Sequence, residues 1–189
     1  MQQIIPSEFT EGWWSAAERR PSPNHDLRPP HTVDMLVVHA ISLPPGEYGS
    51  AAISALFCNT LDYGAHPYYS GLQGLKVSAH FLIERDGRLT QYVSVLHRAW
   101  HAGVSRFSGQ NACNNRSIGV ELEGCDDDPF TPAQYLSLGR LTAALFGQFP
   151  ALSLARIVGH ADIAPDRKTD PGPLFDWIGF RAAVAAARR

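Results

Sequence analysis

Two of the eight histidines in this sequence share a context that the others lack. His39 ends the apolar segment "MLVVH" and His160 ends "RIVGH", and both segments are typical of short buried strands. In open α/β sheets, binding sites gather where the ends of strands meet loops. A lone histidine in such a position is more often a hydrogen-bonded structural residue, whereas two in matching positions indicate a metal site.

Asp170 is the candidate for a third metal ligand. In "RKTDP", Pro171 biases Asp170 toward an extended backbone, and extended residues two apart project to the same side. Lys168 and Asp170 are therefore expected to face one pocket. The alternative is an exposed Lys–Asp pair in a polar loop, which contributes about 0–1 kcal/mol to stability. By itself this segment favours the loop, and His39 is what turns the interpretation toward a metal site.

Two histidines and one carboxylate form a ligand set suited to Zn²⁺. Catalytic zinc sites use three protein ligands and leave one position for water. A structural zinc would add a fourth side chain, often cysteine, and no cysteine follows His160 in the sequence. Zinc lowers the pKa of a bound water from about 15.7 to about 7, which makes hydroxide available at neutral pH. The pattern therefore favours a zinc hydrolase.

A hydrolase also needs a base and a positive group for the oxyanion. Glu121 lies in the middle of the apolar segment "IGVELEG", where burial and a nearby metal would shift its pKa in opposite directions. Glu123 shares that face and is the competing candidate for the base. The alternative for both residues is that this face of the sheet is exposed to solvent and has no catalytic role. Lys168 is the candidate for oxyanion stabilisation, where one donor contributes on the order of 10²–10³ in rate.

Aromatic residues in loops suggest where a substrate binds. Tyr68 and Tyr69 lie in "AHPYYSG" and Trp100 in "RAWHAG", and flat aromatic faces often stack on sugar rings. A tryptophan in a loop fills the hydrophobic core about as often as it stacks on a ligand. His80 is expected to be a buried residue behind the site rather than a ligand, and the role of His101 stays open.

The elements that must position these residues follow from hydrophobic periodicity. The sequence predicts a hairpin joined at Asp86-Gly87, and a helix whose start carries Thr131 as N-cap with Gln134 completing a capping box. Residues 1–30 are expected to be extended, and residues 96–117 irregular. The expected strands are 33–41, the hairpin 77–95, 117–124 and 155–160, and the expected helices are 50–59, 131–149 and about 174–187.

Length and composition set the fold class and exclude some partners. The 189 residues are 44% hydrophobic and 18% charged, which fits one domain spanning residues 1–189. The order of elements predicts a mixed α/β fold, with a central mixed sheet flanked by helices. A formal net charge of −2 suggests neither nucleic acid nor an anionic membrane as partner, so a small-molecule substrate is expected.

The N-terminus and the cysteines indicate a cytoplasmic protein. No basic segment followed by an apolar run precedes residue 14, so no secretory signal is expected. The three cysteines are an odd number without CxxC spacing, which favours free thiols in a reducing compartment. We expect a monomer.

Several long motifs occur in an order that resembles the AmpD family of zinc-dependent N-acetylmuramoyl-L-alanine amidases. They are "LVVHAISLPPGEYG", "AHPYY", "VSAHFLIERDG", "RAWHAGVS", "CNNRSIGVELEG" and "GHADIAPDRKTDPGP". The resemblance extends from about Gly12 to Phe180. It implies the amidase fold and hydrolysis of the amide between the lactyl group of 1,6-anhydro-N-acetylmuramic acid and L-alanine, in cytoplasmic peptidoglycan recycling. It also implies lower β-lactamase induction, because the enzyme would remove the muropeptide signal.

The resemblance also assigns roles to individual residues. It implies His39, His160 and Asp170 as zinc ligands, Glu121 as the catalytic carboxylate and Lys168 as the transition-state lysine. Trp100 matches a position beside the sugar and Lys76 one that faces the peptide, and the expected substrate-binding set is completed by Tyr68, Arg116 and Ala164.

This chain departs from the family in four segments, at five positions. Ala40 replaces a usual Asn, Ala112 a usual Arg, and Ala161 a usual Cys, Ser or Asn. "CNNRS" replaces "CNDFS", so Arg116 is expected to restore the lost positive charge. No departure touches a ligand or the candidate base, so the affected property is the preference among stem peptides.

Two other functions fit the same pattern. A non-catalytic peptidoglycan-binding module usually lacks a metal ligand, whereas all three candidates are present here. An amidase for polymeric cell wall would need export.

Overall fold

The structure is a computed structural model, and it describes residues 8–30 and 33–189. Within these residues, six strands form the central sheet, in the spatial order β12, β5, β11, β6, β7, β3. Their bounds are β12 Ile157–Gly159, β5 Met35–Ile41, β11 Ser117–Glu123, β6 Phe81–Ile83, β7 Leu89–Gln91 and β3 Glu18–Arg19.

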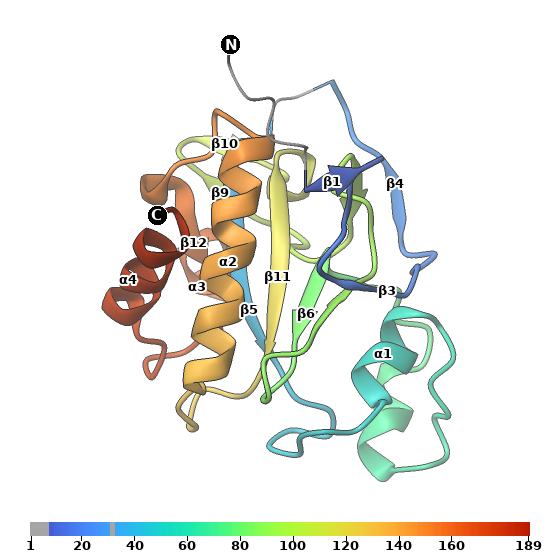
Figure 1. Cartoon of the computed structure of the whole chain (residues 1–189). Helices are drawn as coiled ribbons and strands as arrows, with labels where there is room; N and C mark the ends of the chain where they lie inside the picture. Colours follow the sequence, from blue (N-terminus) through green and yellow to red (C-terminus); the bar gives the residue numbers. More distant parts are fainter. Residues whose placement is uncertain (1–7, 31–32) are drawn as a thin grey trace.

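The four strands from β12 to β6 are mutually parallel, while β7 is antiparallel to β6 and parallel to β3. Near-continuous apolar sequences such as "MLVV" in β5 belong in a parallel sheet whose two faces are both covered. The expected mixed sheet flanked by helices is confirmed (Figure 1).

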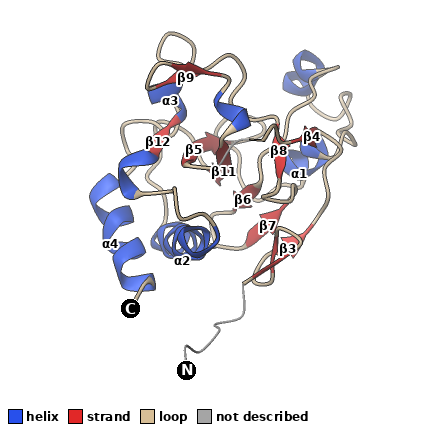
Figure 2. Cartoon of the chain, turned by 90° about the horizontal axis from the view of Figure 1, so that it is seen from above, coloured by secondary structure: helices blue, strands red, loops and turns tan. Residues whose placement is uncertain are grey.

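One face of the sheet is covered by two helices, α2 (Pro132–Gln148) and α4 (Trp177–Ala187), which pack side by side (Figure 2). Thr131 caps α2 as predicted: its Oγ1 accepts from the Gln134 backbone N–H at 3.1 Å, and the Gln134 side chain accepts from the Thr131 N–H at 3.0 Å. The buried stripe of α2 consists of Leu138, Leu141 and Leu145.

The opposite face of the sheet is covered by short elements and loops (Figure 2). Residues 96–117 were expected to be irregular, but they contain several of these short elements. Their turns are closed by backbone hydrogen bonds, which hydrophobic periodicity does not reveal. These elements are α1 Ala52–Phe57, η1 Pro67–Leu72, β4 His25–Leu27 paired with β8 His97–Ala99, β9 Arg106–Phe107 paired with β10 Gln110–Asn111, η2 Cys113–Asn115 and α3 His160–Ile163.

Three predicted elements differ from the structure. The predicted hairpin is present but its strands are only three residues each. The last strand ends at Gly159, and His160 begins the one-turn helix α3. The part of residues 1–30 that the structure describes holds the short strands β1 Phe9–Thr10, β2 Trp13–Trp14, β3 and β4, while residues 1–7 lie outside the described residues.

The register of β5 and β11 determines where the functional side chains point. Glu121 is the direct partner of His39, and these two strands are parallel. Val38 and Val120 pack into the core beneath α2, whereas Val37 belongs to a separate cluster on the other face. Because side chains alternate along a strand, His39 and Glu121 both project to the face away from α2.

Two further observations concern the cysteines and the helices. Cys58, Cys113 and Cys125, all in the described part of the chain, are unpaired, as the odd count predicts. Among residues 8–30 and 33–189, no helix has the length and apolar character needed to cross a bilayer.

Candidate active site

Three candidate metal ligands converge at the carboxyl ends of β5 and β12. The Nδ1 atoms of His39 and His160 lie 2.9 Å apart, and each lies 3.1 Å from Oδ2 of Asp170. Both histidines are buried and Asp170 is mostly buried. Segments from distant parts of the chain thus bring three donor atoms to one point, as the sequence predicts.

The geometry of this cluster fits a zinc ion. Tetrahedral bonds of about 2.0–2.1 Å would separate ligand atoms by about 3.3 Å, close to the separations observed. The second nitrogen of each histidine is also occupied: His160 Nε2 donates to the Ala102 carbonyl at 3.1 Å, and His39 Nε2 lies 2.9 Å from His101 Nδ1. Because a carbonyl can only accept, the His160 contact leaves the His160 Nδ1 lone pair facing the other two candidate ligands.

The charges of the cluster are also those that a cation needs. Burial lowers the pKa of His39 to about 4, despite the opposing hydrogen bond to Asp170, so this ring is neutral at neutral pH. For Asp170, burial acts to raise the pKa, but the hydrogen bonds with His160 and His39 outweigh it and hold the pKa well below its usual range. A neutral imidazole and a carboxylate are the forms that bind a metal.

Glu121, the candidate base, is a buried carboxyl group beside the cluster. Its side chain lines the cavity beside the cluster, and its Oε2 is shielded from solvent without a hydrogen-bond partner among the described residues. Burial, and then the negative charge of Asp170, raise its pKa well above the ordinary value, while the positive charge of Lys168 acts in the opposite direction. Raising the pKa of a carboxyl group makes its ionised form a stronger proton acceptor.

The competing candidate, Glu123, has a structural position. Its Oε1 accepts from the backbone N–H of Gly49 at 2.6 Å, and its Oε2 accepts from the backbone N–H of Arg85 at 3.1 Å. Although it shares a face of β11 with Glu121, it does not line the cavity that holds the cluster. Glu121 is therefore the carboxylate that the structure places beside the candidate ligands.

The cavity itself has a volume of about 510 Å³. Lys168 and Asp170 both line it, as their spacing of two residues predicts. The predicted substrate-binding residues Trp100, Lys76 and Tyr68 line it as well, and the Tyr68 side chain is 45% exposed. The cavity therefore offers aromatic surface, one lysine at its rim and one lysine beside the candidate ligands.

A second cavity of about 690 Å³ adjoins the first, because Gly103 and Arg167 line both. Ala164, expected to bind substrate, lines this second cavity, together with the exposed Arg106. The Arg167 side chain is used structurally, donating to the backbone carbonyls of Ala102 and Val104 at 2.8 Å each.

Arg116 lies elsewhere, although the sequence analysis expected it to bind substrate. Its guanidinium pairs with the Asp34 carboxylate and donates to Gln110, and it is absent from the described residues that line either cavity. The second cavity is lined by both Ala112 and the cation Arg106, which directly pairs with Asn111 in the β9–β10 hairpin.

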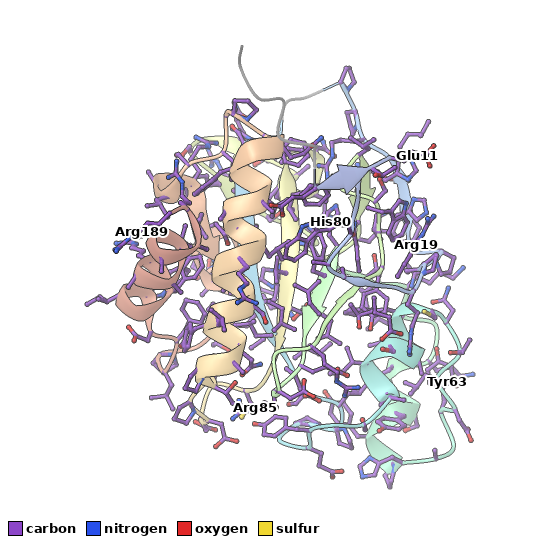
Figure 3. All side chains as sticks on the ribbon, in the orientation of Figure 1. Glu11, Arg19, Tyr63, His80, Arg85 and Arg189 are labelled. Carbon is purple, nitrogen blue, oxygen red and sulfur yellow. The ribbon has the colours of Figure 1, made fainter. Side chains whose placement is uncertain are left out.

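The structure places two histidines that were not predicted to be ligands, His80, expected to be buried behind the site, and His101, whose role was open. His80 lies in the interior (Figure 3), where its Nδ1 accepts from the Gly119 N–H at 3.0 Å, and it makes no hydrogen bond to the candidate ligands in the described structure. His101 contacts His39 directly. Its segment has no periodicity, and the only sequence signal was its position next to Trp100 in the motif "RAWHAGVS".

Comparison with known proteins gives consistent matches. The chain matches the N-acetylmuramoyl-L-alanine amidase family over residues 29–173. It is 54% identical over 175 residues to the 1,6-anhydro-N-acetylmuramyl-L-alanine amidase AmpD of Citrobacter freundii, covering 92% of this chain and 93% of that protein.

Solved structures show the same similarity. The crystal structure of a selenomethionine derivative of AmpD matches with a TM-score of 0.91 and 54% identity, covering 93% of this chain and 98% of that one. The amidase AmiD from E. coli, in complex with the substrate anhydro-N-acetylmuramic acid-L-Ala-D-γ-Glu-L-Lys, matches with a TM-score of 0.59 and 29% identity, covering 87% of this chain and 60% of that one.

Proposed function

Because this chain belongs to the N-acetylmuramoyl-L-alanine amidase family, we propose that it cleaves 1,6-anhydro-muropeptides in peptidoglycan recycling, with Zn²⁺ as its cofactor. The bond cleaved is the amide between the lactyl group of the anhydro-muramic acid and the L-alanine of the stem peptide. Its similarity to known amidases shows that the chain is an amidase. The names of these relatives contain the same 1,6-anhydro sugar.

One observation supports the zinc-dependent reaction above the others. Donor atoms of His39, His160 and Asp170 form one group, of which His160 and Asp170 line a cavity that Glu121, with its unpartnered Oε2, also lines. A ligand set of this kind leaves a position for water or for a carbonyl oxygen. Bound there, zinc would supply a polarised carbonyl and a more acidic water.

The chain's own residues supply the proton transfers. Glu121 Oε2 takes a proton from the attacking water and then delivers it to the amide nitrogen as L-alanine leaves, which a carboxyl group of raised pKa can do in both directions. The Lys168 ammonium faces the same cavity and stabilises the negative charge that develops on the lactyl carbonyl oxygen.

The remaining cavity residues orient the two halves of the substrate. Trp100 and Tyr68 offer flat faces for the anhydro sugar, and Lys76 offers a cation to a carboxylate of the stem peptide. The second cavity, with Ala164 and Arg106, extends the peptide side. We assign to Arg106 the substrate-binding role that was expected of Arg116. Arg106 lines the second cavity, and its guanidinium has no ion-pair partner among the described residues.

Mass spectrometry of the purified protein with a 1,6-anhydro-muropeptide tests this proposal. We expect two products, the anhydro sugar and the free peptide, and their loss on treatment with a chelator and return with Zn²⁺. Glu121→Gln is the matched control for a spontaneous reaction. If the substrate binds but no products form, the chain is a muropeptide-binding module instead.

The biological setting is part of the same proposal. We expect a monomer of one domain, acting in the cytoplasm and lowering β-lactamase induction by removing the muropeptide signal. Expression in an inducible strain that lacks this activity should lower both the anhydro-muropeptide pool and the β-lactamase level. A wild-type chain that lowers neither, while the purified enzyme is active, would contradict the cellular role alone.

A further inference from the structure

Behind the candidate ligand His39 lies a line of hydrogen-bonding groups that the reaction described above does not use. His39 Nε2 is 2.9 Å from His101 Nδ1, and His101 Nε2 is 3.1 Å from Oγ of Ser117. Ser117 is completely buried at the start of β11, and its hydroxyl donates to the Cys113 carbonyl at 2.7 Å. The line thus runs from the metal position to a fixed backbone acceptor.

The direction of these hydrogen bonds follows from the serine. Its single hydroxyl proton is used on the Cys113 carbonyl, so its oxygen can only accept from His101. The His101 proton is then on Nε2, which leaves Nδ1 as an acceptor for the His39 Nε2–H. The His39 Nδ1 lone pair consequently faces His160 and Asp170.

The opposite direction would close the metal position. If Ser117 donated to His101 Nε2, its oxygen would face the Cys113 carbonyl oxygen at 2.7 Å without a proton between them. His101 would then donate to His39 Nε2 and force the His39 proton onto Nδ1, the atom that lies among the candidate ligands. Only one of the two directions is therefore compatible with both the backbone and a bound cation.

We propose that His101 and Ser117 are positioning residues that fix the tautomer of His39 and so raise the affinity for the metal. This inference rests on the proposed function, since it assigns a task toward the ion that His39 would hold. Neither residue is itself a ligand: among the described residues, the group of possible metal donors is His39, His160 and Asp170.

The surroundings of His101 are consistent with a ring held in one position. A Cβ atom built on Gly119 would lie 2.4 Å from Cγ of His101, so the ring packs directly on the bare backbone of β11. On the other side, Oδ1 of Asn114 accepts from the backbone N–H groups of His101 and Ala102, at 3.3 and 2.8 Å. The position of the ring is thus set by β11 and η2 together.

Metal affinity, measured by competition with a chromogenic chelator, provides the first test. His101→Leu should bind Zn²⁺ about 10–100-fold more weakly than the wild type, as expected for loss of an outer-shell partner. His101→Asn places an amide oxygen near the position of Nδ1 and should restore most of that affinity. Ser117→Ala and Gly119→Ala should each weaken zinc binding although neither residue touches a candidate ligand.

His80→Asn is the matched control for packing. The His80 side chain is completely buried and its ring lies 5.7 Å from the His101 ring, centroid to centroid, but it does not contact His39. Its replacement should lower the unfolding temperature and leave zinc affinity within about threefold. If the His101→Leu, Ser117→Ala and His80→Asn variants all bound zinc like the wild type, the inference would be overturned.

The tautomers themselves can be read in the metal-free protein by imidazole ¹⁵N NMR. We expect His39 and His101 both to carry their proton on Nε2, and Ser117→Ala to mix the tautomers of His101. A His101 proton on Nδ1 would overturn the inference even if the enzyme were fully active. A wild-type protein that neither binds zinc nor cleaves the muropeptide would instead overturn the proposed function, and this inference with it.

Discussion

Asp170 and Glu121 line the same cavity, but one belongs to the candidate ligand cluster and the other has a free carboxyl oxygen. We therefore expect Asp170→Ala to lose bound zinc and activity together. Glu121→Gln should retain zinc and lose turnover by on the order of 10²–10⁴, the usual contribution of a general base. Zinc content by elemental analysis and steady-state rates distinguish the two variants.

Glu123→Gln is the control for that pair of variants. It should reduce stability, because Glu123 accepts from two backbone N–H groups, and leave the rate near that of the wild type. A Glu121→Gln enzyme of near-normal rate, alongside a slow Glu123→Gln enzyme, would exchange the roles of the two carboxylates.

Lys168 is expected to affect both the rate and its pH dependence. Its positive charge lowers the pKa of Glu121, in opposition to burial and to the charge of Asp170. In Lys168→Met the Glu121 pKa should rise, and since the base must be ionised to act, the acidic limb of kcat/KM should move to higher pH. The plateau rate should fall on the order of 10²–10³ through loss of oxyanion stabilisation.

A pH profile of kcat/KM for the Lys168→Met enzyme checks this expectation. Lys168→Arg keeps the charge and should keep the acidic limb in place. A Lys168→Met profile that drops in height without moving along the pH axis would leave Lys168 an oxyanion residue only.

Individual site residues can be predicted from the sequence where their type is unusual for the segment that holds them. His39 and His160 end apolar strands and Glu121 interrupts one, so their chemistry stands out against the background. Arg116 and His101 lie in a segment without periodicity, where the side-chain direction depends on η2 and on long-range partners such as Asp34. No local pattern specifies such partners. The prediction that Arg116 binds substrate was therefore wrong about its position, because Arg116 does not line the cavity.

The packing of helix α2 against helix α4 depends on the close approach of Gly139 to Ala183. A Cβ atom on Gly139 of α2 would lie 2.8 Å from the backbone carbon of Ala183 in α4 and 2.9 Å from its Cβ. Gly139→Ala should therefore destabilise the protein by about 1–3 kcal/mol through overpacking, although alanine favours a helix by about 1 kcal/mol. Urea unfolding monitored by circular dichroism measures the difference.

Gly147 is the matched control in the same helix. It is exposed, and nothing lies within 4 Å of a Cβ built there, so Gly147→Ala should show only the helix-propensity gain of up to about 1 kcal/mol. Both variants should keep the wild-type rate, because α2 lies on the face of the sheet away from the cavity. A stabilised Gly139→Ala protein would show that the two helices can separate at little cost.

Elements with strong local signals were predicted well. The capping box at Thr131 and the apolar strands containing His39 and Glu121 were found within two residues of their observed bounds. The strands of the 77–95 hairpin were predicted too long, because their outer residues bond elsewhere: the Ser78 N–H donates to the Trp100 carbonyl and the Val95 N–H to the Gly12 carbonyl. Pairing partners distant in sequence, such as β3 beside β7, have no local signature.

The whole molecule should be sensitive to acid in its metal-free form. Burial lowers the pKa of His39 to about 4 and holds the pKa values of His80 and His101 well below 6.5. As the pH falls below about 6.5, the unfolded chain takes up protons that the folded chain does not, so the free energy of unfolding decreases. Each such histidine contributes about 1.4 kcal/mol per pH unit across this window.

Urea midpoints of the chelator-treated protein between about pH 7 and pH 5 test this expectation. We expect a steady fall, with a smaller slope in His80→Asn because one buried histidine is removed. Asp170 acts at lower pH: its depressed pKa stabilises the fold above the ordinary aspartate range, and that contribution is lost only as the pH falls further. A flat midpoint across the window would contradict the neutral, buried state of these rings.

The pairing of His39 with Glu121 across two adjacent parallel strands bears on protein engineering. The spacing between the candidate ligand His39 and the candidate base Glu121 is set by one pair of residues in adjacent strands, so we expect loop variation around the cavity to leave it unchanged. A scaffold that offered two neighbouring parallel strands with histidine and glutamate at paired positions, a second histidine just beyond a third strand, and an aspartate beside both histidines would reproduce the core of this site. Grafting these four positions onto another parallel sheet would therefore be a compact route to a designed metalloamidase.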